Sequence, residues 1–400
     1  MRKRCLAAVF LTVLLFSCAA CSAVQGDRSG QESTAADTEA ESGEQSGEIE
    51  VPQTLGTLAY DREMEPDYAE GFRIDYYEGG FALITIESEG QYLVVPEGET
   101  APEGLDGAIT VLYRPIANVY LAASAVMDMY VSLDALDDIR FSALDADGWY
   151  ISEAAEKMEA GDIVYAGKYS APDYELILSE GCGLAVENTM IYHTPEVKEE
   201  LESLGIPVIV DYSSYESDPL GRMEWIMLYG VLTGREEQAA EVFDAQAALY
   251  ESEEGEESGA TVAFFYITST GAVNVRKSSD YLPRMIEQAG GTYIFEDLGD
   301  EEETASSTVS MQMEEFYAAA KDADYLIYNS TIEGEVESMD DFLALSPLLE
   351  NFKAVSEGHV YCTTKNLYQA SMELGTITSD IRKMLNGETG DMEYLYQVEE

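Results

Sequence analysis

The sequence predicts an α/β fold with two Rossmann-like lobes, each built on a central, mostly parallel sheet and bridged by a single long helix. Short apolar strands alternate with amphipathic helices along most of the chain, a pattern typical of βαβ units and parallel sheets. Between two such series lies a helical stretch, residues 222–250, with few helix-breaking residues. The length of 400 residues and the hydrophobic content of 46% suffice for two lobes with cores of their own.

The N-terminus has the layout of a secretory signal. Three basic residues at positions 2–4 precede an apolar stretch at residues 6–16 that is too short to span a bilayer. Cys18 fits a lipobox, with Cys21 as the alternative, and lipid on either cysteine would anchor the chain to the outer face of the cell membrane. We therefore predict a lipoprotein signal peptide over residues 1–21 and an extracytoplasmic location. An ordinary cleaved signal without lipid is the alternative.

Residues 22–56 form an acidic segment that is rich in Ser, Glu and Gly and nearly free of large apolar side chains. Such a segment buries too little surface to fold, and charge repulsion extends it. Behind a lipidated cysteine, it is predicted to be a tether that lets the folded part reach a partner near the membrane.

The N-terminal lobe is predicted over residues 57–221. Its first segments are strand-like, and a Glu-Gly-Gly turn joins the first two. These strands are expected at residues 72–77, 81–86, 92–95 and 109–113. Helices and short apolar strands then alternate: a helix at 116–136, a strand at 163–166, a helix from 173, a strand at 184–186, a helix from Thr194 to Gly205 and a strand at 206–210.

Residues 222–252 are predicted to be the interlobe helix, and residues 253–400 the C-terminal lobe. A second series of strands and helices occupies this lobe. Its strands are expected at 261–267, 325–328 and 360–362, and its helices at 281–289, at 341–352 with an interruption near Pro347, and at 371–385.

The net charge of −57 excludes nucleic acid and anionic lipid headgroups as partners, because so acidic a surface repels them. Beyond the signal region the cysteines are Cys182 and Cys362, which lie far apart without CxxC spacing. Unpaired thiols are therefore expected, rather than a disulfide framework or a zinc site. His193 and His359 fall in different lobes without the spacing of metal ligands, so no metal site is predicted.

The chain contains no GxSxG, HExxH, P-loop or dinucleotide-binding motif, and its two histidines supply little general-base capacity near neutral pH. We therefore expect a protein that binds and releases a ligand, and neither an enzyme nor a protein with a cofactor of its own.

Four segments, in order within residues 113–385, resemble the substrate-binding lipoproteins of ABC importers for iron chelates and cobalamin. They are DYELILSEGCGLAV at 173–186, where the family's usual Pro-Asp is Cys182-Gly183, LESLGIPVIV at 201–210, AGGTYIF at 289–295, and FKAV at 352–355 followed by GHVY at 358–361. Their common order along the chain makes the resemblance specific.

The resemblance implies two lobes joined by a rigid helix, a ligand held in the cleft between them, and a small closing motion. It implies a monomeric extracytoplasmic solute-binding protein that captures an iron chelate (siderophore), heme or a corrinoid. The ligand would pass to the permease and ATPase of an ABC importer. Two alternatives stay open: a surface sensory or adhesion lipoprotein with the same fold, and a secreted hydrolase.

The resemblance also implies two glutamates that dock onto the permease. Glu175 corresponds to an exposed glutamate on the first lobe of the family, and Glu315 to its counterpart on the second lobe, with Glu314 as the alternative register. Pairing with permease arginines would orient the complex. In a chain with 78 acidic residues, an ordinary solvated acid is the alternative.

Ligands of α/β lobes bind outside the carboxyl ends of the strands, which selects the loops at those ends. Aromatic side chains there would stack on a planar ligand, and cations would hold an anionic chelate by charge-assisted hydrogen bonds. The ligand-binding candidates are Arg114, Trp149, Tyr150, Lys168, Tyr169 and Arg276, and Arg222 is a further cation that has a purely structural alternative. The alternative is core packing for the aromatic residues and a salt bridge for the cations.

Overall fold

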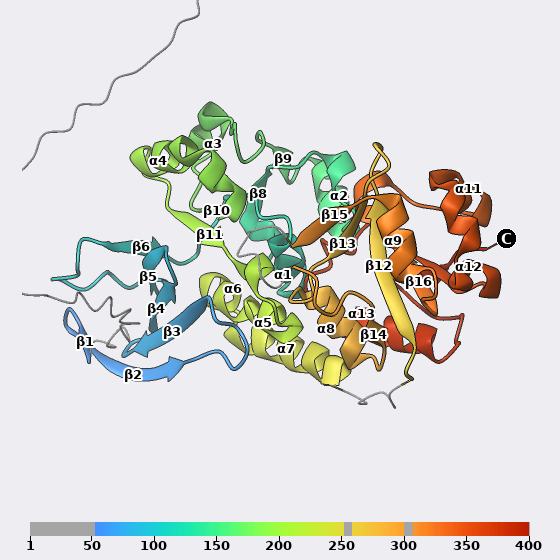
Figure 1. The fold of residues 1–400 in the computed structure, drawn as a ribbon. Coiled ribbons are helices and arrows are strands. Elements are labelled where there is room, and N and C mark those ends of the chain that lie inside the picture. The colour runs from blue at the N-terminus through green and yellow to red at the C-terminus, as the bar shows by residue number, and fades with distance from the viewer. Residues whose placement is uncertain (1–52, 252–257, 300–306, 400) are drawn as a thin grey trace, which may run out of the picture. The chain divides into compact units, whose positions relative to one another are not determined.

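The structure is a computed structural model that describes residues 53–251, 258–299 and 307–399. The predicted signal peptide, with Cys18 and Cys21, and most of the predicted tether lie outside the described residues. Along the described chain three β-sheets follow one another, which we call the N-terminal, central and C-terminal sheets (Figure 1). None of the described helices combines the length and apolar character needed to cross a bilayer.

The N-terminal sheet has six strands in the order β1-β2-β3-β4-β5-β6 and is antiparallel except for the β5–β6 pair. Its strands are β1 (Thr54–Leu55), β2 (Leu58–Met64), β3 (Phe72–Tyr77), β4 (Phe81–Ile86), β5 (Gly90–Val95) and β6 (Ile109–Tyr113). The strands predicted at 72–77 and 81–86 are confirmed. Residues 54–113 do not join the mostly parallel sheet expected for the N-terminal lobe, because tight turns such as residues 78–80 impose antiparallel pairing.

The central sheet has five strands, all parallel, in the order β11-β10-β7-β8-β9. Its strands are β7 (Val119–Leu121), β8 (Ile139–Ser142), β9 (Val164–Tyr165), β10 (Ala185–Asn188) and β11 (Val208–Asp211), connected by the helices α1 (Val126–Ser132), α2 (Ser152–Ala160), α3 (Tyr174–Ser179) and α4 (Pro195–Ser203). The predicted alternation of short buried strands with helices is confirmed here.

The helix predicted at residues 116–136 is wrong: the structure has strand β7 there, followed by the short helix α1. Val119, Tyr120 and Leu121 are all buried, because both faces of β7 are covered. A short, continuous apolar run of this kind lacks the periodicity that separates a buried strand from a buried helix.

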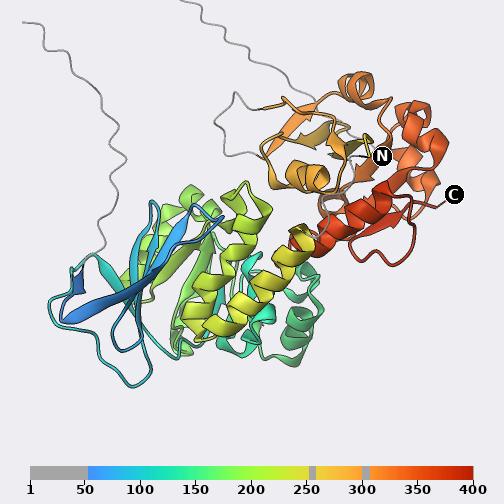
Figure 2. The same cartoon turned by 90° about the horizontal axis from the view of Figure 1, so that it is seen from below.

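Three helices, not one, follow the central sheet: α5 (Pro219–Glu224), α6 (Ile226–Thr233) and α7 (Glu236–Glu251). The single helix predicted for residues 222–250 is therefore wrong. Gly234 caps α6 in the left-handed conformation with a φ of 74°, which turns the chain off the helical path. Helix α7 packs against α6 and against the late helix α13 (Leu374–Leu385), toward which it runs in Figure 2.

The C-terminal sheet has the order β15-β13-β12-β16-β17-β18, with β14 paired to β12. Strands β12, β14, β16 and β17 form a parallel group, and β13 and β18 pair with this group in antiparallel fashion. The strands are β12 (Thr261–Ile267), β13 (Val273–Arg276), β14 (Thr292–Tyr293), β15 (Thr308–Met311), β16 (Tyr325–Tyr328), β17 (Val360–Thr363) and β18 (Leu395–Gln397).

The helices around this sheet are α8 (Tyr281–Gln288), α9 (Met313–Ala320), α10 (Ser330–Glu333), α11 (Met339–Leu345), α12 (Lys353–Glu357) and α13. Strands β12 and β16 have the predicted bounds. The helix expected at 341–352 ends at Leu345 because Pro347 cannot continue it, and a 3-10 turn, Pro347–Asn351, follows.

The core of the C-terminal sheet is centred on Phe265, a fully buried residue of β12. Its ring centroid lies 4.5 Å from that of Phe316, 5.8 Å from that of Tyr328 and 6.4 Å from that of Phe342. These rings come from two strands and two helices, so Phe265 joins the sheet to both helices.

We expect Phe265→Ala to lower the free energy of unfolding by about 3–5 kcal/mol, because it removes a buried ring and leaves a cavity. Ile332→Ala is the matched control, since Ile332 is 53% exposed and should change stability by less than about 0.5 kcal/mol. Urea unfolding curves of both variants measure the difference. Equal stability of the two variants would contradict the assignment of Phe265 to the core.

Candidate ligand-binding site

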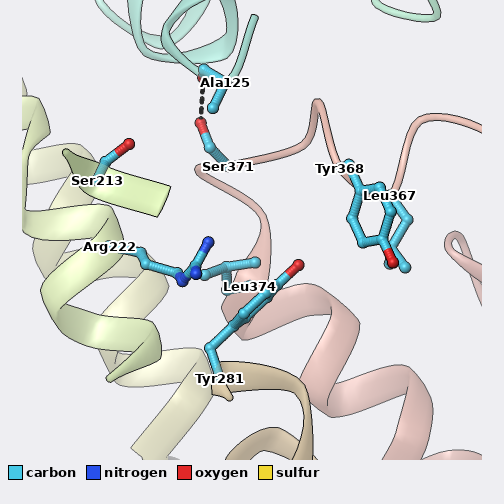
Figure 3. A pocket seen from close by; sticks show the side chains of 8 residues that line it. All are labelled: Ala125, Ser213, Arg222, Tyr281, Leu367, Tyr368, Ser371 and Leu374. Carbon is cyan, nitrogen blue, oxygen red and sulfur yellow. Dashed lines mark hydrogen bonds between the residues drawn. The ribbon is translucent and has the colours of Figure 1, made fainter. Parts of the chain in front are cut away.

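A pocket lies where loops at the carboxyl edge of the central sheet meet α5, α8 and the loop between β17 and α13 (Figure 3). It is lined by Ala125, Ser213, Arg222, Tyr281, Leu367, Tyr368, Ser371 and Leu374. Ala125 precedes α1 and Ser213 follows β11, so the parallel strands deliver both to the same edge. Figure 3 shows the guanidinium of Arg222 and the hydroxyl of Tyr281 directed into the space between these elements.

Arg222 supplies the positive charge of this pocket. Its Nε donates to the carbonyl oxygen of Glu216 at 2.8 Å, and its Nη2 donates to the carbonyl oxygen of Ser214. The guanidinium carbon lies 3.8 Å from the centroid of the Tyr281 ring, a cation–π arrangement. No carboxylate among the described residues forms an ion pair with Arg222, and burial lowers its pKa. The guanidinium is thus held by carbonyl oxygens, and the nearby acids Asp280, Glu216 and Asp211 act on its charge without forming an ion pair among the described residues.

Arg276, a predicted ligand residue, lies behind Tyr368 and is buried. Its Nη1 donates to Ser307 Oγ at 2.7 Å and lies 3.4 Å from Asp280 Oδ2, while its Nη2 donates to the Tyr368 hydroxyl. The same hydroxyl accepts a hydrogen bond from Asn329 Nδ2 at 2.6 Å. Arg276 therefore has its own carboxylate and orients Tyr368 in the pocket wall.

Two other predicted ligand-binding residues make their contacts outside the pocket. Arg114 lies at the α6–α7 junction, where its Nη1 is 3.1 Å from Glu236 Oε1, and it does not line the pocket. Trp149 is only 5% exposed, and its Nε1 donates to Ser142 Oγ at 3.0 Å. Stacking on a ligand requires an exposed ring face, so Trp149 has the packing role that the sequence left as its alternative.

The remaining predicted residues are at the surface or near it. Tyr150 is 47% exposed, and its ring centroid lies 6.0 Å from the amino group of Lys365 on the β17–α13 loop. Lys168 is exposed and has no acid partner among the described residues. Tyr169 is half-buried and packs against the core of the central sheet. Of these three, Tyr150 alone reaches the β17–α13 loop through a contact that the structure defines within the described residues.

The β17–α13 loop, residues 364–373, closes the pocket. Four hydrogen bonds join it to loops of the central sheet: Gln369 Nε2 to the Gly148 carbonyl at 2.8 Å, the Tyr150 N–H to Gln369 Oε1 at 2.8 Å, Ser371 Oγ to the Ala125 carbonyl at 2.6 Å, and the Met372 N–H to Asp128 Oδ2 at 2.8 Å. The pocket beneath encloses about 30 Å³. That space suits a water molecule, whereas small-molecule sites measure about 300–1,000 Å³.

Three buried acids, Asp128, Glu187 and Asp211, lie at this carboxyl edge, and burial raises the pKa of each of them. Burial raises the pKa of Asp128 to about 7, and the Met372 N–H that it accepts works against that rise. Burial also raises the pKa of Glu187, at the end of β10, to about 8. Neither carboxyl oxygen of Glu187 has a hydrogen-bond partner among the described residues. At pH 7 the carboxyl of Glu187 is therefore mostly neutral, and that of Asp128 is about half neutral.

The sequence missed Tyr281, Tyr368 and Asp128. Tyr281 follows the capping residue Asp280 at the start of α8. The capping residue indicates where the helix begins, but it does not indicate that Tyr281 lines a pocket. Tyr368 lies in a loop without periodicity, and its partner Arg276 is distant in the chain. Only the three-dimensional contact between the two sheets brings these residues together.

The predicted docking glutamates are accessible. Glu175 is exposed in the first turn of α3, and both Glu314 and Glu315 are exposed in the first turn of α9. Cys182 and Cys362 are free thiols. Among the described residues, no group of three His, Cys, Asp or Glu side chains is placed to hold a metal ion.

Residues 147–367, more than half of the chain, match the family model described as Periplasmic binding protein. Two relatives are uncharacterized lipoproteins of Methanocaldococcus jannaschii. One is 22% identical over 346 residues, covering 78% of this chain and 78% of the relative. The other is 24% identical over 354 residues, covering 83% of this chain and 86% of the relative.

Solved structures share the fold. A periplasmic binding protein from Veillonella parvula superposes with a TM-score of 0.54 at 15% identity, covering 68% of this chain and 92% of that one. The periplasmic heme-binding protein HutB of Vibrio cholerae superposes with a TM-score of 0.52 at 17% identity, covering 66% of this chain and 98% of that one. A periplasmic heme-binding protein from Pseudomonas aeruginosa superposes with a TM-score of 0.53 at 13% identity, covering 70% of this chain and 97% of that one.

Asp128 makes stability depend on pH. Its raised pKa means that between about pH 4 and pH 7 the folded state holds a proton that the unfolded state has released, so the free energy of unfolding falls as pH rises. In Asp128→Asn this fall should be smaller by roughly 2–4 kcal/mol. Urea unfolding at several pH values measures it, with the exposed Asp147→Asn as control. Parallel pH profiles for wild type and Asp128→Asn would contradict the assignment.

Proposed function

The chain belongs to the periplasmic binding protein family, and from that membership we propose that it is the extracytoplasmic solute-binding component of an ABC importer. It is a binding protein and not an enzyme. In this proposal residues 57–221 and 253–400 are the two lobes, residues 222–252 connect them, and the ligand lies between them. The contacts of α7 with both α6 and α13 support a connecting role for that helix.

The observation that carries this proposal is the guanidinium of Arg222, half-buried against Tyr281 and without an ion pair to a carboxylate among the described residues. A buried cation needs a compensating anion, and a ligand carboxylate or phosphate would supply it. We propose an iron chelate, heme or a corrinoid that carries such a group. The heme-binding proteins of Vibrio cholerae and Pseudomonas aeruginosa, which share the fold, support this ligand class.

A ligand of this size requires the pocket to open. The pocket of about 30 Å³ is closed by the β17–α13 loop, which four hydrogen bonds join to the central-sheet part of the chain. We propose that this loop separates from the central-sheet loops when ligand enters. Each bond contributes about 0.5–1.5 kcal/mol, so ligand contacts of ordinary strength suffice to replace them.

We also propose how the protein meets its partners. Lipid on Cys18, or on Cys21, would hold the chain at the outer face of the membrane, and residues 22–56 would tether the folded part. Glu175 on α3 and Glu315 on α9, both exposed, would pair with permease arginines. The relatives named as lipoproteins support the anchor.

Arg222→Met should weaken binding of an anionic chelate about 10- to 100-fold, the usual effect of losing a charge-assisted hydrogen bond. Titration calorimetry with hemin, a ferric hydroxamate, a ferric catecholate and cobalamin measures the affinity. Arg62→Met is the control, because Arg62 is an exposed arginine on the N-terminal sheet. If none of the panel binds the wild type at micromolar concentration, the ligand class is wrong. If Arg222→Met binds as wild type does, the site is wrong.

Charge reversal of both docking glutamates, Glu175→Lys with Glu315→Lys, should abolish uptake of the bound ligand by cells while leaving its affinity unchanged, because repulsion replaces pairing at the permease. A second double variant, Glu175→Lys with Glu314→Lys, tells which of the two neighbouring glutamates on α9 docks onto the permease. Glu153→Lys, on the exposed surface of α2, is the control. Undiminished uptake by both double variants would refute the docking assignment. If the protein binds its ligand but cells take up that ligand equally well without the protein, a sensory role is favoured.

A further inference from the structure

We propose that the N-terminal sheet positions Arg222 for ligand binding, by holding Glu216 and Glu224 through the β2–β3 loop, residues 65–71. This sheet precedes the part of the chain that matches the family model, residues 147–367. The inference rests on the proposed role of Arg222 as the ligand anchor, and it assigns Glu216 and Glu224 as positioning residues.

Glu216 joins the β2–β3 loop to Arg222 directly. Its Oε1 accepts hydrogen bonds from the Gly71 N–H at 3.0 Å, from the Glu70 N–H at 3.1 Å and from Trp225 Nε1 at 3.0 Å. The carbonyl oxygen of the same residue accepts the Nε of Arg222 at 2.8 Å. One residue therefore connects the backbone of the N-terminal sheet to the guanidinium in the pocket.

Glu224 makes a second, parallel connection at the other end of α5. Its carboxylate accepts the backbone N–H groups of Asp67, Tyr68 and Ala69, each at 2.8 Å. Both glutamates are buried, with 7% of Glu216 and 4% of Glu224 exposed. Buried carboxylates persist only where such hydrogen bonds compensate their lost hydration, so the loop and α5 hold each other in place.

The contact between the loop and α5 is also tight. A methyl group on Gly71 would lie 2.8 Å from Trp225 Cζ2 and 3.2 Å from Glu216 Oε1, and one on Gly221 would lie 2.9 Å from the Tyr68 carbonyl oxygen. The ring centroids of Phe72 and Trp225 are 5.0 Å apart. The loop cannot shift toward α5 without moving these groups.

Helix α5 depends on such support because it has six residues, Pro219–Glu224. A helix this short is not stable alone, so neighbouring contacts fix the direction of its side chains. Arg222 projects from α5 onto Tyr281, while Glu224 and Glu216, which lies three residues before the first residue of the helix, face the β2–β3 loop. A displacement of the loop would therefore move the guanidinium relative to Tyr281.

The test perturbs the loop without touching the pocket. Gly71→Ala introduces the methyl group described above, and Gly107→Ala, in the connection between β5 and β6, is the matched control, since no atom lies within 4 Å of its added methyl. Glu216→Gln, which keeps the side-chain shape but weakens the N–H bonds, is a second variant in case Gly71→Ala does not fold. The readout without ligand is the rate at which phenylglyoxal modifies Arg222, measured by peptide mass spectrometry.

We expect Gly71→Ala or Glu216→Gln to raise the modification rate of Arg222 about threefold or more, and Gly107→Ala to leave it unchanged. Equal rates in all variants and wild type overturn the positioning role. Because this arm uses no ligand, it decides the inference even if hemin fails to bind the wild type, a result that would count only against the proposed ligand class.

The second arm uses hemin, an iron chelate that carries carboxylates. Gly71→Ala should weaken hemin binding about three- to tenfold in the wild-type background and have no further effect in Arg222→Met, because the loop acts through Arg222. Equal weakening in both backgrounds would mean that the substitution acts elsewhere, and would overturn the inference.

Discussion

The site depends on one topological constraint: parallel strands present their carboxyl ends at a single edge of a sheet. In the central sheet this brings Ala125, after β7, and Ser213, after β11, to the pocket, although they are 88 positions apart in the sequence. In the C-terminal sheet, the loop after β17 starts from the corresponding edge and supplies Tyr368 and Ser371. Strand direction thus brings part of the pocket wall together, and the helices α5 and α8 add Arg222 and Tyr281 to it.

Electrostatics then singles out one of those residues. The chain has 78 acidic residues for 21 Lys and Arg, so a cation near the surface readily finds a carboxylate, as Arg114 and Lys198 do with Glu236 and Glu89. Arg222 is different because its hydrogen-bond acceptors are carbonyl oxygens, which orient a guanidinium without neutralising it. The acids that act electrostatically on Arg222 are Asp280, Glu216 and Asp211, and burial raises the pKa of Asp211, which limits its negative charge.

Sequence patterns predicted the fold wherever an element carried a local signal. Strands β12 and β16 have the predicted bounds because each is a short apolar run next to turn residues. The prediction of a continuous helix at 222–250 failed at Gly234, where the left-handed conformation ends α6 although the residues on either side favour a helix. In the site, the sequence marked Arg222 and Arg276 as cations worth attention, but it could not tell that Arg276 is paired with Asp280 and Arg222 is not. That distinction depends on contacts between distant segments.

The three sheets meet at α5, and their contacts there differ in strength. Toward the C-terminal lobe, Asp218 lies 3.5 Å from Arg284 with both side chains more than a third exposed, an ion pair of little stability. Toward the N-terminal sheet, Glu224 is buried and accepts three backbone N–H groups. In the opening proposed above, the weaker contact should part first, so that Arg222 would stay with Glu216 and lose Tyr281. Opening then uncovers one face of the guanidinium, while its direction stays set by the N-terminal side.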